Sequence, residues 1–134
     1  MELTFEAKDS NLEAVNNLVH SQLPYDCTTQ TINPLDLAVE EFFVNIAHYA
    51  YGAVNTEKKA TISCTMKGCT LTVSFTDSGK PFNPLELPDP DITLSAEKRR
   101  IGGLGIYLTK KFMDKVEYEY RYGKNILTIK KDLI

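Results

Sequence analysis

The stretch 33–52, with the sequence NPLDLAVEEFFVNIAHYAYG, constrains the fold more than any other part of the chain. Its apolar residues lie nearly all round a helix, and a helix of that kind is normally buried. The stretch nevertheless carries Glu41, Asn45 and His48, which at about 100° per residue fall within roughly 60° of one another. Because a bare buried carboxylate or amide costs several kcal/mol, we expect this polar stripe to face a partner, an ion or a cleft.

Local rules predict where this helix begins and ends. Asn33 is expected to cap its first N–H groups, and Pro34 suits the first helical position. Asp36 falls in the first turn, where the helix dipole favours an anion. Gly52 is expected to end the helix. The stretch before it, 24–31, is expected to be a loop.

Alternating apolar and polar residues predict five strands, a first strand and two hairpins that each turn at a glycine. These strands are expected at residues 3–7, 60–66, 70–76, 116–122 and 126–130. Helices are predicted at about 10–22, opened by a capping box of Ser10 and Glu13, and at about 103–113. This order predicts an α+β two-layer sandwich, in which a mostly antiparallel, mixed sheet of about five strands is covered on one face by about three helices.

Composition places the chain among ordinary globular proteins. Its 134 residues are 43% hydrophobic and 25% charged, which suits a single domain over 1–134. The net charge of −3 argues against a direct nucleic-acid surface. No apolar run approaches the ~20 residues of a membrane span, and the first residues lack the layout of a signal peptide. The three cysteines are expected to stay reduced, so we expect a cytoplasmic protein.

Two glycine-containing turns stand out as candidate ligand sites. Gly102, Gly103, Leu104 and Gly105 open a predicted helix, where backbone N–H groups and the helix dipole can hold an anion such as phosphate, although many such clusters are plain turns. The run Asp77-Ser78-Gly79 ends a predicted strand. It is either a simple turn or a carboxylate placed to accept a hydrogen bond from an exocyclic amine such as that of adenine.

The pair Glu41 and Asn45 lies one helical turn apart. Such a pair is often a solvated helix edge, but the apolar positions around it weaken that interpretation here. An amide oxygen suits Mg²⁺, which keeps several waters and shares phosphate oxygens. A carboxylate one turn away can accept a proton from an attacking hydroxyl.

The segment 83–101 is a long loop with three prolines and no clear period. Loops of this length inside compact domains are usually functional. It ends in the basic run Lys98, Arg99 and Arg100, which is either solvated charge or a contact for terminal phosphates when the loop closes.

Taken in order, these clusters resemble the motifs of the GHKL ATPases, the Bergerat-fold group that includes histidine kinases, gyrase B, MutL and Hsp-type chaperones. Glu41-x3-Asn45 resembles the N box, DSGKPFNP at 77–84 the first glycine box, and GGLGIYL at 102–108 the second. The DSGKPFNP string, the short lid and the 30 residues 102–131 closely resemble the anti-sigma-factor serine/threonine kinases of the RsbW and SpoIIAB type. The resemblance covers essentially the whole chain.

The resemblance implies a role for each matched residue. Glu41 would be the general base, Asn45 the Mg²⁺ ligand and Asp77 the acceptor of the adenine amine, while Gly79 would let the nucleotide approach. The other cofactor-binding residues implied in the same way are Gly102, Gly103, Leu104 and Gly105 of the second glycine box, Arg100 of the lid at 83–101, and Thr128 of the last strand.

The resemblance also implies cofactors and partners. Members use ATP and Mg²⁺, bind a sigma factor, and phosphorylate a serine of a STAS-domain anti-anti-sigma protein, which switches partners in transcription regulation. They commonly form homodimers and act without a membrane or direct nucleic-acid contact. One departure concerns His48, which follows Asn45 by three residues here, whereas the histidine follows the asparagine by four in the RsbW and SpoIIAB pattern.

Two alternative functions are consistent with the same motifs. A histidine-kinase-like catalytic domain would need an upstream helix pair with a phospho-accepting histidine, and the chain starts directly with its first predicted strand. A non-catalytic ATP-sensing module would bind nucleotide without transferring phosphate. Retention of both Glu41 and Asn45 argues against that loss of activity.

Overall fold

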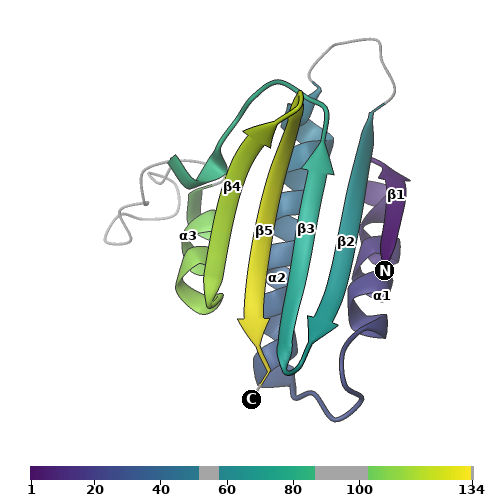
Figure 1. Cartoon of the computed structure of the whole chain (residues 1–134), viewed down its shortest axis with the longest axis vertical. Helices are drawn as coiled ribbons and strands as arrows, with labels where there is room; N and C mark the ends of the chain where they lie inside the picture. Colours follow the sequence, from purple (N-terminus) through teal and green to yellow (C-terminus); the bar gives the residue numbers. More distant parts are fainter. Residues whose placement is uncertain (52–57, 87–102, 134) are drawn as a thin grey trace.

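The computed structural model describes residues 1–51, 58–86 and 103–133, and it forms two layers, a sheet and a set of helices (Figure 1). The elements in chain order are β1 (Glu2–Glu6), the 3-10 turn η1 (Asp9–Asn11), α1 (Leu12–Ser21), α2 (Thr29–Asn45), the π-helix η2 (Ile46–Ala50), β2 (Lys59–Lys67), β3 (Thr70–Asp77), the 3-10 turn η3 (Pro84–Glu86), α3 (Gly103–Phe112), β4 (Lys115–Arg121) and β5 (Lys124–Asp132). None of the described helices has the length and apolar character needed to cross a membrane.

The five strands are ordered β1-β2-β3-β5-β4. Every pairing among them is antiparallel, including the two predicted hairpins β2-β3 and β4-β5. The predicted fold class, an α+β sandwich with a sheet of about five strands, is therefore confirmed. The sheet is more regular than expected, because no described pair gives it the mixed character that was predicted.

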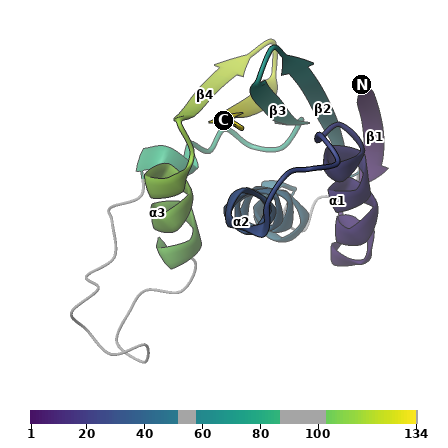
Figure 2. The same cartoon turned by 90° about the horizontal axis from the view of Figure 1, so that it is seen from below.

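The helices α1, α2 and α3 lie side by side under one face of the sheet, with α2 in the middle (Figure 2). The core forms between α2 and the sheet face that points toward the helices. Apolar residues recur at the spacing of one helix face in α2 and at every second position in the strands, so both elements present an apolar surface there. The largest side chains that are at most 1% exposed include Phe43, Leu35, Ile62, Phe75 and Ile129.

The start of α2 differs from the prediction. The helix begins at Thr29, so Asn33 does not cap it and Pro34 lies inside it. Proline already has a helical φ, and near a helix start it removes only one backbone hydrogen bond, here to the carbonyl of Gln30, so the helix tolerates it. Asp36 lies in the second turn instead of the first, and its Oδ1 is 2.5 Å from Nε2 of His20 in α1.

The capping box predicted for the first helix is also wrong. The 3-10 turn η1 precedes α1, and neither element has a side-chain hydrogen bond at its N-cap. The cap residue of α1, Asn11, instead donates from Nδ2 to the carbonyl oxygen of Glu6 at 2.9 Å, which ties the helix start to the end of β1.

The end of α2 changes the direction of His48. After Asn45 the chain continues as a π-helix, whose wider turn rotates each residue by less than an α-helix does. The Nε2 atom of His48 lies 2.7 Å from the carboxylate of Asp9, on the α1 side of α2, whereas Glu41 faces α3 on the opposite side (Figure 2). His48 therefore leaves the predicted polar stripe.

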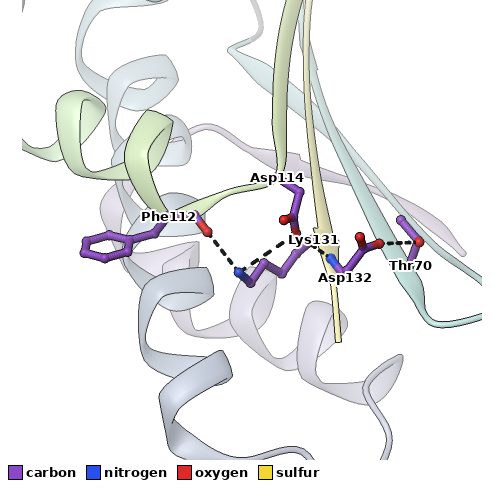
Figure 3. A network of polar contacts seen from close by, with 5 residues as sticks. All are labelled: Thr70, Phe112, Asp114, Lys131 and Asp132. Carbon is purple, nitrogen blue, oxygen red and sulfur yellow. Dashed lines mark hydrogen bonds and ion pairs between the residues drawn. The ribbon is translucent and has the colours of Figure 1, made fainter. Parts of the chain in front are cut away.

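A polar network joins β3, β5 and the α3–β4 connection (Figure 3). Lys131 donates from Nζ to the carbonyl oxygen of Phe112 at 3.0 Å and lies 3.9 Å from Oδ2 of Asp114. The same carboxylate accepts the backbone N–H of Asp132 at 2.7 Å, and Thr70 donates to the Asp132 side chain at 2.6 Å. The network lies at the end of the sheet where β3 begins, opposite to the end where α2 stops (Figure 1).

Candidate functional site

Three of the predicted motifs meet at one end of the molecule. The C-terminal end of α2 and the end of β3 lie at the top in Figure 1, and the start of α3 lies to the left in the upper half. These segments pack closely at two glycines, Gly105 of α3 and Gly79 of the turn after β3. The site consists of these two contacts and of the hydrogen-bonded turn at Asp77.

The first contact joins Glu41 of α2 to Gly105 of α3. A Cβ atom at position 105 would fall within 3.0 Å of both carboxylate oxygens of Glu41, closer than real Cβ atoms come to other atoms. Glycine at this position is therefore what allows the carboxylate to lie against the backbone of the first turn of α3. The sequence predicted that both residues belong to one site, and the structure brings them together.

The surroundings of Glu41 change its acidity. Burial of the half-buried side chain raises the pKa of Glu41, and the neighbouring charge of Glu40 raises it further. A carboxyl group with a raised pKa is closer to the range in which it can take up and release protons near neutral pH. The position and the pKa of Glu41 both suit a proton acceptor.

The second contact joins the turn after β3 to the end of the π-helix. A Cβ atom on Gly79 would fall within 3.0 Å of the carbonyl carbon and oxygen of Ala50, so the close packing of two backbones requires glycine here. The N–H of Lys80 donates to the same carbonyl at 3.1 Å. The N–H of Ser78 donates to the hydroxyl of Tyr51 at 3.0 Å, and that hydroxyl donates to the carbonyl of Lys59.

Asp77, the last residue of β3, is a buried carboxylate with one oxygen already engaged. It is 7% exposed, and its Oδ1 accepts hydrogen bonds from the N–H of Gly79 at 2.8 Å and from Nδ2 of Asn125 at 3.0 Å. Burial raises the pKa of Asp77, and these two hydrogen bonds act in the opposite direction. No residue in the described part of the chain donates to Oδ2, which leaves that oxygen as an acceptor for a ligand.

Sequence reasoning missed Asn125, the residue directly opposite Asp77 in the pairing of β3 with β5. It is 6% exposed and contacts several parts of the turn 77–82. A signal existed in the strand pattern, because Asn125 shares the inward phase of Leu127 and Ile129. A polar residue at an apolar phase of a strand indicates a buried hydrogen-bonding role.

The other predicted site residues are less closely joined. Asn45 is the last residue of α2, one turn beyond Glu41, and is partly exposed. Thr128 lies on the outer face of the sheet and is hydrogen-bonded to Ser74 at 3.1 Å, whereas Asp77 faces the helices. The structure therefore does not bring Thr128 to the Asp77 carboxylate.

Several predictions fall at the edge of the described residues or beyond it. Gly103 and Leu104 are the first two residues of α3. Arg100, Gly102 and the lid segment from 87 onward lie outside the described residues. The part of the lid that is described contains η3, and there the N–H of Leu85 donates to Oδ1 of Asn83 at 2.9 Å.

The protein oxygen ligands at this site fit a magnesium ion that is held mainly by water and phosphate oxygens. Within the described residues no group of three or more His, Cys, Asp or Glu side chains gathers to form a metal cage. The amide oxygen of Asn45 is a hard donor, and Mg²⁺ commonly takes one or two protein oxygens together with water and phosphate oxygens.

The comparisons agree with the fold and the motifs. A family described as "Histidine kinase-like ATPase domain" matches residues 5–131. The serine-protein kinase RsbW of Listeria monocytogenes serovar 1/2a is 29% identical over 105 residues, which are 75% of this chain and 66% of that protein. The chain thus spans slightly less than two thirds of that relative.

A second relative is covered more fully. The anti-sigma F factor of Thermoanaerobacter sp. strain X514 is 30% identical over 129 residues, which are 95% of this chain and 88% of that protein. Among solved structures, the RsbU and RsbW domains of Rv1364c from Mycobacterium tuberculosis match with a TM-score of 0.66 and 14% identity. That match covers 99% of this chain and 32% of the other, and at this identity it is a likeness of fold alone.

Proposed function

The chain belongs to the histidine kinase-like ATPase domain family, and from this membership we propose that it is an ATP- and Mg²⁺-dependent protein serine kinase and anti-sigma factor. It binds a sigma factor and phosphorylates a serine of a STAS-domain anti-anti-sigma protein. The names of its relatives, serine-protein kinase RsbW and anti-sigma F factor, support this proposal. The observation that carries it is the contact of Glu41 with Gly105, because it joins the expected base to the expected phosphate turn.

The adenine base is held at Asp77. Oδ1 of this carboxylate is engaged by Gly79 and Asn125, so Oδ2 accepts the exocyclic amine of the base. An ionised carboxylate has acceptors only, and it therefore favours a base that presents an amine over one that presents a carbonyl. Thr128 has no part in this version of the site, because it hydrogen-bonds on the other face of the sheet.

The phosphates are held at the start of α3. Gly102, Gly103, Leu104 and Gly105 offer backbone N–H groups at a helix N-terminus, which favours anions, and Arg100 of the lid adds positive charge. Asn45 holds the Mg²⁺ ion, which supplies charge neutralisation for the phosphates when bound.

Glu41 accepts the proton of the serine hydroxyl that attacks the terminal phosphate. Burial favours proton uptake by this carboxylate, and its place against Gly105 puts it beside the phosphate turn. Most of the rate enhancement in phosphoryl transfer comes from positioning and electrostatic stabilisation, so a fixed carboxylate and a fixed helix N-terminus are the main contributions of the protein.

The remaining parts of the proposal concern the whole protein. It acts as a single ATP-binding domain over 1–134, with a lid at about 83–101, as a homodimer in the cytoplasm. It requires neither a membrane nor direct contact with nucleic acid. The coverage of the relative from Thermoanaerobacter, 95% of this chain, supports the extent of the domain.

A transfer assay tests the proposal. The protein is incubated with Mg-ATP and a STAS-domain protein from the same genome, and phosphoserine is sought by mass spectrometry. Glu41→Gln should abolish transfer but keep ATP binding. Glu13→Gln, a change of an exposed carboxylate on α1, should keep both and serves as the control.

Other outcomes separate the alternatives. ATP binding without transfer to any STAS-domain candidate would favour a non-catalytic sensing module. Phosphohistidine on a partner would favour a histidine-kinase-like domain. A wild-type protein that binds no ATP would overturn the proposal altogether.

A further inference from the structure

We propose that Asn125 is a positioning residue that fixes the orientation of Asp77 and the shape of the turn 77–82, and thereby sets the base selectivity of the nucleotide site. This inference rests on the proposed function, because it concerns how that site recognises its base. Asn125 does not touch the nucleotide in this scheme. It acts through Asp77 and through the backbone of the turn.

The carboxamide of Asn125 uses its full hydrogen-bonding capacity on this turn. Its Nδ2 donates to Oδ1 of Asp77 at 3.0 Å and to the carbonyl oxygen of Lys80 at 2.8 Å, with the carbonyl of Gly79 at 3.4 Å. Its Oδ1 accepts the N–H of Phe82 at 3.1 Å. The hydroxyl of Tyr118 in β4 also donates to Oδ1.

This set of partners fixes the orientation of the amide. The oxygen faces donors and the nitrogen faces acceptors, so a flipped amide would place its NH₂ group against the N–H of Phe82 and its oxygen against the carboxylate of Asp77. A buried polar group with all its partners satisfied is held rigidly. Four residues of a turn of six are thus held by one side chain that lies 43 to 48 positions further along the chain.

The consequence for Asp77 is directional. With Oδ1 engaged by Asn125 and Gly79, Oδ2 is the oxygen presented to a ligand. A carboxylate that can only accept selects an exocyclic amine, as in adenine, and disfavours a carbonyl, as in guanine. Loss of Asn125 frees the carboxylate to rotate and removes a hydrogen bond that favours its ionised form. A protonated carboxyl group can donate a hydrogen bond to a carbonyl oxygen, so the site would then bind a base such as guanine more readily.

The neighbouring elements place acids and phenols around this pair. The hydroxyl of Tyr118 in β4 contacts Asn125, and that of Tyr51, the residue after η2, contacts Ser78. Glu86 of η3 and Tyr120 of β4 act electrostatically on Tyr118. Within the described residues, therefore, the hydrogen bonds to Asp77 are what favours its ionised form.

Nucleotide binding by purified full-length protein tests the inference. Calorimetry with Mg-ATP and Mg-GTP at pH 7.5 should give a preference for ATP in the wild type. Asn125→Ala should weaken ATP binding by about tenfold and lower the ATP-over-GTP ratio by a similar factor, as expected for loss of a hydrogen bond to a charged group. The pH midpoint of ATP binding should also move upward, because the ionised form of Asp77 loses support.

Two further variants cover the case in which Asn125→Ala does not fold. Asn125→Gln keeps a carboxamide that can donate to the turn, and it should retain more ATP selectivity than the alanine variant. Tyr118→Phe removes one donor to Asn125 and should lower selectivity by a smaller factor, in the same direction. Ser74→Ala, which removes a hydrogen bond on the outer face of the same strand as Asp77, is the matched control and should change none of these readouts.

The possible results are distinguishable. A wild type that binds neither nucleotide would overturn the proposed function itself. A wild type that prefers ATP, together with folded Asn125 or Tyr118 variants of unchanged affinity, ratio and pH midpoint, would overturn the positioning role alone. An Asn125→Ala variant that loses ATP and GTP affinity equally, with no shift in the pH midpoint, would also contradict it.

Discussion

Position 105 illustrates how one residue can be explained by a long-range contact. Glycine there opens a helix, but the space for its missing side chain is filled by the carboxylate of Glu41. The hydroxyl of Thr109 donates to the carbonyl of Gly105 at 2.9 Å, so the same turn is also held from within α3. A methyl group at this position therefore affects a catalytic candidate directly.

We expect Gly105→Ala to reduce serine phosphorylation by more than about tenfold, because Glu41 must rotate away or α3 must shift, and small misplacements of catalytic groups are costly. The measurement is initial rate under Mg-ATP saturation, together with thermal unfolding. In the double variant Glu41→Ala/Gly105→Ala the clash is absent, so its stability should exceed that of Gly105→Ala while its transfer stays lost. Equal stability of Gly105→Ala and the double variant would show that the clash with Glu41 does not destabilise the protein.

We expect the ionised side chain of Asp77 to lower the free energy of unfolding at neutral pH. Burial raises its pKa in the folded protein, so the unfolded chain releases this proton first as pH rises. The contribution of Asp77 to stability is therefore most favourable below its unfolded pKa of about 3.9 and is lost as pH rises through the folded pKa.

We therefore expect Asp77→Asn to be more stable than the wild type at pH 7, with a difference that shrinks toward pH 4. The asparagine keeps an Oδ1 acceptor for Gly79 and Asn125, but it should lose ATP binding. Urea unfolding across this pH range measures the difference. A variant less stable than the wild type at pH 7 would mean that the charge of Asp77 contributes favourably to folding.

At the scale of elements, the end of α2 is the junction on which the site depends. The π-helix η2 contacts the turn after β3 through Ala50, and Tyr51, the next residue, links that turn to β2. Sequence patterns predicted a continuous helix up to Gly52, because a change from α to π winding leaves the apolar pattern almost unaltered. The same change explains why His48 pairs with Asp9.

Tyr51→Phe tests this junction. Its hydroxyl donates to the carbonyl of Lys59 and accepts the N–H of Ser78, so both groups lose a partner. We expect the free energy of unfolding to fall by about 1–2 kcal/mol, as for other partly buried hydrogen-bonded groups. Tyr49→Phe, at a 58% exposed position of the same π-helix, should change stability by less than about 0.5 kcal/mol. Equal effects of the two changes in urea unfolding would argue against the junction.

At the scale of the whole molecule, the hairpins and the layer order could be predicted because alternation marks each strand and glycine marks each turn. Gly68 and Gly123 indeed have positive φ values of 62° and 75°. The start of α2 at Thr29 could not be predicted, because Asn33 and Pro34 are residue types typical of a helix start and lie inside this helix. Asn125 was missed for a different reason: its partners lie 43 to 48 residues away, and only strand register brings them together.

Binding of ATP should stabilise the whole domain, because the site joins α2, β3, β5 and α3, and these elements form it only when folded. A ligand that binds only the native state at a hundredfold excess over its Kd adds about 2.7 kcal/mol. For a domain of this size we expect a rise in Tm of several degrees with Mg-ATP, measured by calorimetry at a series of ATP concentrations.

The concentration dependence distinguishes specific binding from a salt effect. The rise in Tm should continue with the logarithm of ATP concentration in the wild type, and it should be absent in Asp77→Asn at the same ionic strength. Because that variant is expected to start from a higher Tm without ligand, the two proteins should converge as ATP is added. Parallel rises in both proteins would mean that ATP stabilises the fold without the Asp77 carboxylate, and the assignment of the base pocket would then be wrong.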